Sequence, residues 1–258
     1  SYLNTIDSKI SIDLQSYMKN IKEISLKRIR KDKERLEKNP LPDIHVIWDK
    51  EDIRKATIMM IGPEKTPYEK GFYFFEMTFP QEYPFKCPSV KFTTRDGTTR
   101  FHPNLYRNGK VCLSLLGTWS GPGWSPSQNV GSLLMAIYSL LCEYPLTQEP
   151  GFETKAKSSK SKQYNQIITY QNVTVCIVDQ LQNLPVKYKE FLPIMKQEFT
   201  KNIDWLLCTL SESIESSKNH KQYKFSFYNM SIKTDYQQVL QDVITTYNDI
   251  NPEAVLFI

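Results

Sequence analysis

Apolar residues recur with two different periods in the first part of the chain. Between residues 17 and 38 they stand at helical spacing among many charges, and Asn39-Pro40 follows, which predicts an amphipathic helix that ends before the proline. Residues 44–92 instead contain short alternating or apolar runs separated by turns, which predicts three or four strands. Because the connections are short, we expect an antiparallel meander and not a parallel sheet with crossover helices.

A helix is predicted directly after Trp124. Ser125-Pro126-Ser127-Gln128 has the pattern of a helix start, with Ser125 as the cap and Gln128 completing a capping box. Apolar residues then recur at helical spacing as far as Leu141, and Tyr144-Pro145 would end the helix.

The last hundred or so residues carry further helical patterns beyond a Lys/Ser-rich junction at 154–162. Residues 164–182 fit either a strand or a helix. The clearer patterns predict a helix along the stripe from Met195 to Ile214, a short strand at 223–227 and a final helix at 236–247. We therefore divide the chain into an N-terminal segment, a core domain and an extension that packs on it, at residues 1–16, 17–153 and 154–258.

Composition adds limits on the class of protein. Forty per cent hydrophobic and 24% charged residues are ordinary for a soluble globular chain. No apolar run is long enough to span a bilayer and no secretory signal opens the sequence, so we expect no membrane partner. The net charge of +5 is mild, and no arginine–aromatic interleaving indicates nucleic-acid binding. Five scattered cysteines argue against a disulfide framework, which favours the cytoplasm or the nucleus.

The segment from Phe101 to Leu116 holds the candidate chemistry. Pro103 fixes its own backbone angle and biases His102 towards an extended conformation. Asn108-Gly109 is a tight-turn dipeptide, and an apolar run begins at Val111. We therefore expect Cys112 at the edge of packed structure, with the carboxamide of Asn104 a short loop upstream.

Three kinds of chemistry could use this loop. A cysteine hydrolase would need a base, and His102 is the only histidine nearby. A metal site would need several ligands at short spacing, and neither Cys-x-x-Cys nor His-x₃-His occurs. A thioester carrier needs a thiol and donors for an oxyanion, and it works best without a base that activates water. The carrier fits these residues best, although composition alone favours Cys112 as a small buried apolar residue, as most free cysteines are.

Several sequence blocks in the same order resemble ubiquitin-conjugating enzymes over roughly residues 25–152. His102-Pro103-Asn104 is similar to part of the active-site signature of that family. So are the position of Cys112 relative to this triplet and the later Trp124-Ser125-Pro126. The other matching blocks are Ala56-Thr57-Ile58-Met59 with Gly62-Pro63, Pro67-Tyr68-Glu69-Lys70-Gly71 through Phe79-Pro80, and Tyr83-Pro84-Phe85-Lys86-Cys87-Pro88. The long tail and the Gly-rich insertion at 117–123 resemble the Z-class of conjugating enzymes.

The resemblance implies an α+β fold and a set of catalytic residues. The fold would have an N-terminal helix, a four-stranded antiparallel meander and C-terminal helices, followed by a mostly helical extension. Cys112 would accept ubiquitin or a ubiquitin-like protein as a thioester and pass it to a lysine or to a ligase cysteine. Asn104 would stabilise the oxyanion or brace its loop, and Glu149 would orient and deprotonate the incoming lysine. His102 and Pro103 would be structural.

The resemblance also implies partners. The N-terminal helix of the family docks on the activating enzyme, which implicates Lys27, Arg28 and Lys31; the Z-class favours the alternative ubiquitin-activating enzyme. Ligase contacts would include Phe85 and the loop formed by Ser125, Pro126 and Ser127. Neither a metal nor an organic cofactor is implied. Two alternatives remain open, namely a catalytically inactive ubiquitin-binding variant of the same fold and, ranked lower, a cysteine hydrolase that uses Cys112 with His102.

Overall fold

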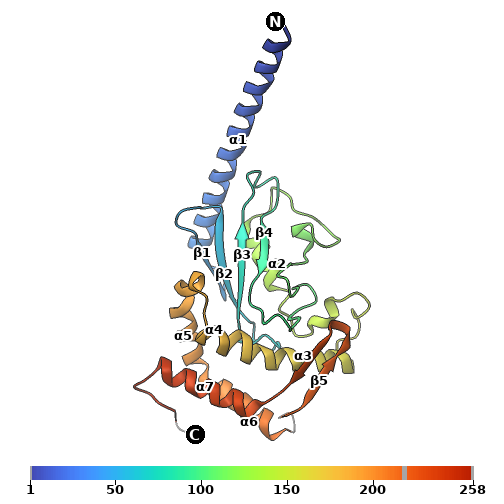
Figure 1. Cartoon of the computed structure of the whole chain (residues 1–258), viewed down its shortest axis with the longest axis vertical. Coiled ribbons are helices and arrows are strands. Elements are labelled where there is room, and N and C mark those ends of the chain that lie inside the picture. The colour runs from blue at the N-terminus through green and yellow to red at the C-terminus, as the bar shows by residue number, and fades with distance from the viewer. Residues whose placement is uncertain (1, 217–219, 257–258) are drawn as a thin grey trace.

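The computed structural model describes residues 2–216 and 220–256 and has the predicted α+β fold. Helix α1 (Tyr2–Lys38) leads into a sheet of four antiparallel strands in the order β1-β2-β3-β4 (Figure 1). The strands are β1 (Ile44–Trp48), β2 (Lys55–Ile61), β3 (Phe72–Thr78) and β4 (Ser89–Phe92). The predicted meander is confirmed, and α1 extends well beyond the expected start at residue 17, so that its first turns project from the rest of the molecule (Figure 1).

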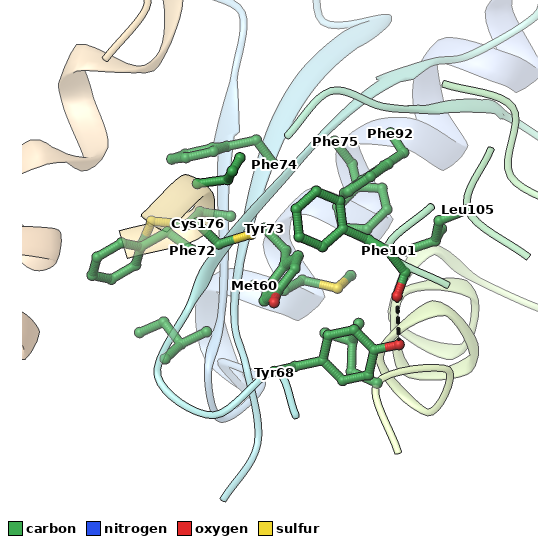
Figure 2. Packing of buried hydrophobic residues seen from close by; sticks show 14 of the residues in the cluster. Met60, Tyr68, Phe72, Tyr73, Phe74, Phe75, Phe92, Phe101, Leu105 and Cys176 are labelled. Atoms are coloured by element: carbon green, nitrogen blue, oxygen red, sulfur yellow. Dashed lines mark hydrogen bonds between the residues drawn. The ribbon is translucent and has the colours of Figure 1, made fainter. Parts of the chain in front are cut away.

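The sheet is packed on both faces, which explains the aromatic density of β3. Tyr73 and Phe75 point to the face that holds Phe92 and Phe101, with ring centroids 6.3 Å apart for Tyr73–Phe101 and 5.3 Å for Phe75–Phe92. Phe74 points to the opposite face. Figure 2 shows this packing, together with the hydrogen bond of 2.7 Å that the Tyr68 hydroxyl donates to the Phe101 carbonyl.

Helix α2 (Val130–Tyr138) begins later and ends earlier than predicted. Its cap is Asn129, which forms a capping box with Ser132, and not Ser125. Ser125 starts a separate turn, in which its backbone N–H donates to the side-chain oxygen of Gln128 at 3.0 Å. The prediction of Ser125 as the helix cap was therefore wrong. The side chain–backbone hydrogen bond between Ser125 and Gln128 instead forms a separate turn before the helix. The apolar residues at 140 and 141 are buried, but they lie beyond the end of the helix.

The extension is mostly helical, as predicted, with three local differences. Residues 159–182 form one helical rod: α3 (Ser159–Gln171), a π-helical segment (Asn172–Asp179) and α4 (Gln180–Gln182). The stripe predicted as one helix is divided at Asn202 into α5 (Leu192–Lys201) and α6 (Ile203–Glu215). A hairpin of β5 (Gln222–Phe225) and β6 (Met230–Lys233) precedes α7 (Tyr236–Ile250), and a 3₁₀ turn, Ser226–Tyr228, connects its strands.

The extension covers the second face of the sheet. Tyr188, in the 3₁₀ segment Val186–Phe191, stacks on Phe74 with ring centroids 4.4 Å apart. From the π-helical segment, Asn172 accepts a hydrogen bond from the Tyr73 hydroxyl and donates to the Glu69 carbonyl at 2.8 Å. One continuous apolar core thus includes residues of both the sheet and the extension. Within the described residues, none of the helices has the length and apolar character needed to cross a membrane.

Candidate functional site

The loop that carries Cys112 folds back on itself as a small irregular hairpin. The backbone N–H of Cys112 donates to the Asn104 carbonyl at 2.8 Å, and the Asn104 side-chain amide donates to the Cys112 carbonyl, also at 2.8 Å. At the tip, Gly109 has a φ of 92°, a conformation that favours glycine. Phe101 and Leu105, both at most 1% exposed, anchor the loop in the core (Figure 2). The sequence spacing therefore brings Asn104 and Cys112 into direct reciprocal contact.

The imidazole of His102 is held inside this loop. It is fully buried, and its Nδ1 accepts a hydrogen bond of 2.9 Å from the backbone N–H of Asn104. Burial, together with the nearby charge of Arg100, lowers the pKa of His102 to about 3. The ring is therefore neutral at physiological pH, and its basic nitrogen is already occupied by the backbone.

Cys112 lies outside the strands of the sheet, as expected, but its side chain is only 2% exposed. Burial of Cys112 is what composition alone favoured for this residue. The insertion folds back beside it, because the Thr118 hydroxyl donates to the Val111 carbonyl at 2.7 Å and accepts from the Leu113 N–H at 2.9 Å. These are the two residues that flank the cysteine. Trp119 in the same insertion is 41% exposed and does not pack down.

Glu149 follows the 3₁₀ turn Pro145–Gln148 and is half-buried. Its carboxylate accepts a hydrogen bond from the hydroxyl of Tyr228, which lies in the extension at the connection between β5 and β6. Burial and this carboxylate together raise the pKa of Tyr228 well above its ordinary value, so the phenol stays protonated as the donor. The hairpin of the extension therefore reaches the candidate site.

Arg100 connects the same hairpin to the cysteine loop. Its guanidinium donates to the carbonyls of His102, at 3.1 Å, and Pro103. It also lies over the aromatic rings of Tyr106, 3.5 Å from the centroid, and of Tyr228, at 5.2 Å. Neither Arg100 nor Tyr228 was predicted as a site residue, because neither belongs to a motif and their contact joins segments far apart in the chain.

The residues assigned to ligase contact lie on two loops that are hydrogen-bonded to each other. Phe85 is 57% exposed, and the indole N–H of Trp124 donates to the Pro84 carbonyl at 2.7 Å. The hydroxyls of Ser125 and Ser127 are 2.7 Å apart, in the turn that contains Pro126. Both loops present these residues to solvent or leave them half-buried.

The three basic residues assigned to the activating enzyme differ in their surroundings. Lys27 and Lys31 are exposed on α1. Arg28 is bound within the fold: it pairs with the buried carboxylate of Asp32 at 3.2 Å and donates to the backbone carbonyls of Pro126, at 2.9 Å, and Gln128. Arg28 thus fastens the 125–128 turn to α1.

Replacing Arg28 with alanine should destabilise the fold by about 3 kcal/mol, because it removes the nearer of the two ion-pair partners of the buried Asp32 carboxylate and leaves Arg35 at 3.9 Å. Chemical denaturation would measure the change in free energy of unfolding. Lys31→Ala on the exposed face of the same helix is the control and should change this free energy by less than about 0.5 kcal/mol. Equal denaturation midpoints for Arg28→Ala and the wild type would contradict the structural role of Arg28.

Among the described residues, no group of three or more His, Cys, Asp or Glu side chains is arranged to hold a metal ion. The side-chain donors and acceptors of the site belong to Arg100, His102, Asn104, Thr118, Glu149 and Tyr228. The cysteines at positions 87, 112, 142, 176 and 208 are all free thiols.

Comparison with known proteins identifies the family. Residues 28–172 match the family model described as "Ubiquitin-conjugating enzyme". A Xenopus tropicalis protein named "Ubiquitin-conjugating enzyme E2 Z" is 36% identical over 224 residues, which are 86% of this chain and 71% of that protein. The Homo sapiens protein of the same name is 41% identical over 181 residues, 70% of this chain and 51% of that protein, so the chain spans about half the length of this relative.

A more distant match is the Mus musculus "Dual E2 ubiquitin-conjugating enzyme/E3 ubiquitin-protein ligase BIRC6", which is 34% identical over 171 residues, 62% of this chain and 4% of that protein. The similarity to the proteins named E2 Z extends beyond the segment that the family model matches, into the extension. With the family model matching more than half of the 258 residues, this chain belongs to the ubiquitin-conjugating enzyme family.

Proposed function

We propose that this chain accepts ubiquitin or a ubiquitin-like protein as a thioester on Cys112 and transfers it to a lysine or to a ligase cysteine. The observation that carries the proposal is the reciprocal pair of hydrogen bonds between Asn104 and Cys112 in a chain of this family. These bonds hold a carboxamide donor beside the only cysteine of the loop, which is the arrangement that acyl transfer through a thioester needs.

The chemistry follows from the residues. In charging, the Cys112 thiolate bonds to the carbonyl carbon of a thioester on the activating enzyme, and the thiolate of that enzyme leaves. In discharge, the amine nitrogen of a lysine bonds to the same carbon, the bond to Cys112 breaks, and the nitrogen loses a proton. A tetrahedral oxyanion forms in each step, and a donor aimed at it stabilises the transition state. In discharge we assign that role to the Asn104 amide and the reception of the lysine to Glu149.

The state of His102 favours a carrier over a hydrolase. A cysteine hydrolase needs an imidazole that takes a proton from the thiol and later from water. Burial holds the pKa of His102 near 3, and its Nδ1 is engaged by the Asn104 backbone at 2.9 Å. A thioester on Cys112 would therefore have no neighbouring imidazole to activate water, which would lengthen its lifetime.

The partners in this proposal are an activating enzyme, which consumes the ATP, and ubiquitin ligases. Of the three basic residues assigned to the activating enzyme, Lys27 and Lys31 are exposed on α1, whereas Arg28 is engaged within the fold. Exposed Phe85 supports the ligase surface. The likeness to proteins named E2 Z supports a preference for the alternative activating enzyme, and the free cysteines support action in the cytoplasm or nucleus.

The test is ATP-dependent charging with ubiquitin and each of the two activating enzymes, followed on a non-reducing gel. We expect a band that carries one added ubiquitin and disappears on reduction, with the alternative enzyme giving the faster rate. Absence of any charged band with either enzyme and any ubiquitin-like protein would overturn the carrier function and favour an inactive ubiquitin-binding variant.

Because Cys112 is 2% exposed, charging requires a local opening around the thiol, and the insertion is hydrogen-bonded to both neighbours of this cysteine. Thr118→Val removes the hydroxyl that bonds to both neighbours of Cys112 and should raise the rate of Cys112 alkylation by iodoacetamide about fivefold, the effect of losing about 1 kcal/mol of hydrogen bonding. Mass spectrometry would follow the modification, with exposed Cys208 as the internal reference. Thr118→Ser keeps the hydroxyl and should react like the wild type; equal rates for the Val and Ser variants would show that the hydroxyl does not control opening.

A further inference from the structure

We propose that Tyr228, in the extension, is a positioning residue for discharge to lysine, which couples the carboxylate of Glu149 to the loop that carries Cys112. This inference rests on the proposed function and deepens it, because it gives the extension a part in the reaction. It stands on the geometry of two contacts made by one side chain.

The first contact is made by the phenol hydroxyl. It donates a hydrogen bond to Oε2 of Glu149. Within the described residues, this is the one hydrogen bond that the carboxylate accepts. The donor orients the carboxylate and leaves Oε1 available to a second partner. As the amine nitrogen of a lysine bonds to the thioester carbon and the bond to Cys112 breaks, its proton can pass to Oε1. A carboxylate fixed by one donor presents the other oxygen in a constant place, which lowers the entropic part of the barrier.

The second contact is made by the aromatic ring of Tyr228. Its centroid is 5.2 Å from the guanidinium of Arg100, which donates to the carbonyls of His102 and Pro103. The backbone at Tyr228 is tied to the same loop, because Arg107 donates to the Tyr228 carbonyl. Tyr228 thus contacts both the carboxylate of Glu149 and the residues that hold the loop of Asn104.

Tyr228 is itself held firmly in place. Its ring packs against Tyr164, with centroids 5.7 Å apart, and the Tyr164 hydroxyl donates to the Arg100 carbonyl at 2.6 Å. The next residue but one, Met230, accepts a hydrogen bond through its sulfur from the Arg100 N–H at 3.3 Å. A side chain with these neighbours is a rigid support for Glu149 and not a mobile one.

The test is Tyr228→Phe, which removes the hydroxyl and keeps the ring over Arg100. Charging should proceed at the wild-type rate, whereas single-turnover discharge to free lysine should fall about tenfold, the effect of losing one hydrogen bond to a charged group. Discharge to hydroxylamine should be unchanged, because its electron-withdrawing oxygen makes the N–H proton acidic enough to pass to water without a carboxylate. Tyr223→Phe in the same hairpin is the matched control, since the Tyr223 hydroxyl makes no hydrogen bond to the loop or to Glu149, and it should behave like the wild type.

A double-mutant cycle distinguishes positioning from a general structural effect. In a Glu149→Gln background, Tyr228→Phe should cause no further loss of lysine discharge, because both changes act on the same group. Full additivity, a parallel loss of hydroxylamine discharge, or unaltered lysine discharge in Tyr228→Phe would each overturn the role of Tyr228. Failure of the wild type to charge at all would instead overturn the proposed function.

Discussion

Cys112→Ala is expected to abolish the charged band completely, and Cys112→Ser to give a band that resists reduction. Alanine offers no nucleophile, whereas the serine hydroxyl forms an oxyester that a thiol reductant does not cleave. The measurement is ATP-dependent charging, run on paired gels with and without reductant. Both variants should fold. Cys112 is buried, but alanine and serine are close to cysteine in volume, so neither replacement leaves a large cavity or overpacks the site.

The matched control is Cys208→Ala, which removes the exposed thiol on α6. It should charge like the wild type, because none of the described contacts of Cys208 reaches the cysteine loop: its sulfur pairs with Glu212 at 3.7 Å on the same helix. A charged band in Cys112→Ala as strong as that of the wild type would assign the thioester to another residue and end the proposal for Cys112.

Asn104→Ala is expected to slow discharge to lysine by on the order of 10²–10³, the usual loss when an oxyanion donor is removed. Charging should remain largely intact, because the activating enzyme supplies its own environment for that step. In the uncharged protein the Asn104 amide donates to the Cys112 carbonyl at 2.8 Å, so the same variant also loses a brace of the loop. If Asn104 only braced the loop, its removal would lower the free energy of unfolding by about 1 kcal/mol and would slow charging and discharge alike.

Single-turnover discharge of the purified thioester, followed over time at several lysine concentrations, separates the two roles. Asn108→Ala at the exposed tip of the same hairpin removes an equivalent side chain, whose oxygen accepts from the Lys110 N–H at 3.0 Å, and should discharge at nearly the wild-type rate. If Asn104→Ala discharges as fast as Asn108→Ala, the amide does not stabilise the oxyanion.

The sheet and the cysteine loop were predictable because their signals are local. The alternation in β1 and the aromatic run of β3 reflect burial against neighbours that any meander would supply. The start of α2 was not predictable in the same way, since Ser125 and Asn129 both begin patterns that cap a helix and only packing selects Asn129. Strand β6 was not predicted, although its four residues alternate between buried and exposed positions.

The rest of the site depends on contacts that no local pattern encodes. The spacing of Asn104 and Cys112 was sufficient to place them together, because one turn at Gly109 joins them. Arg100 and Met230 are 130 residues apart in sequence, and their contact exists only because the extension folds back over the loop. The hydrogen bonds that tie the insertion to both neighbours of Cys112 likewise follow from no local pattern.

The stacking of Tyr188 on Phe74 has a consequence for how such a chain can be shortened. A truncated form that ends at residue 153 would uncover Phe74 and leave the Tyr73 hydroxyl without its partner Asn172. The uncovered aromatic surface would lower the solubility of this form, which would prevent an assay of its catalysis. Substitutions in the tail and in the facing part of the sheet are therefore constrained by one another.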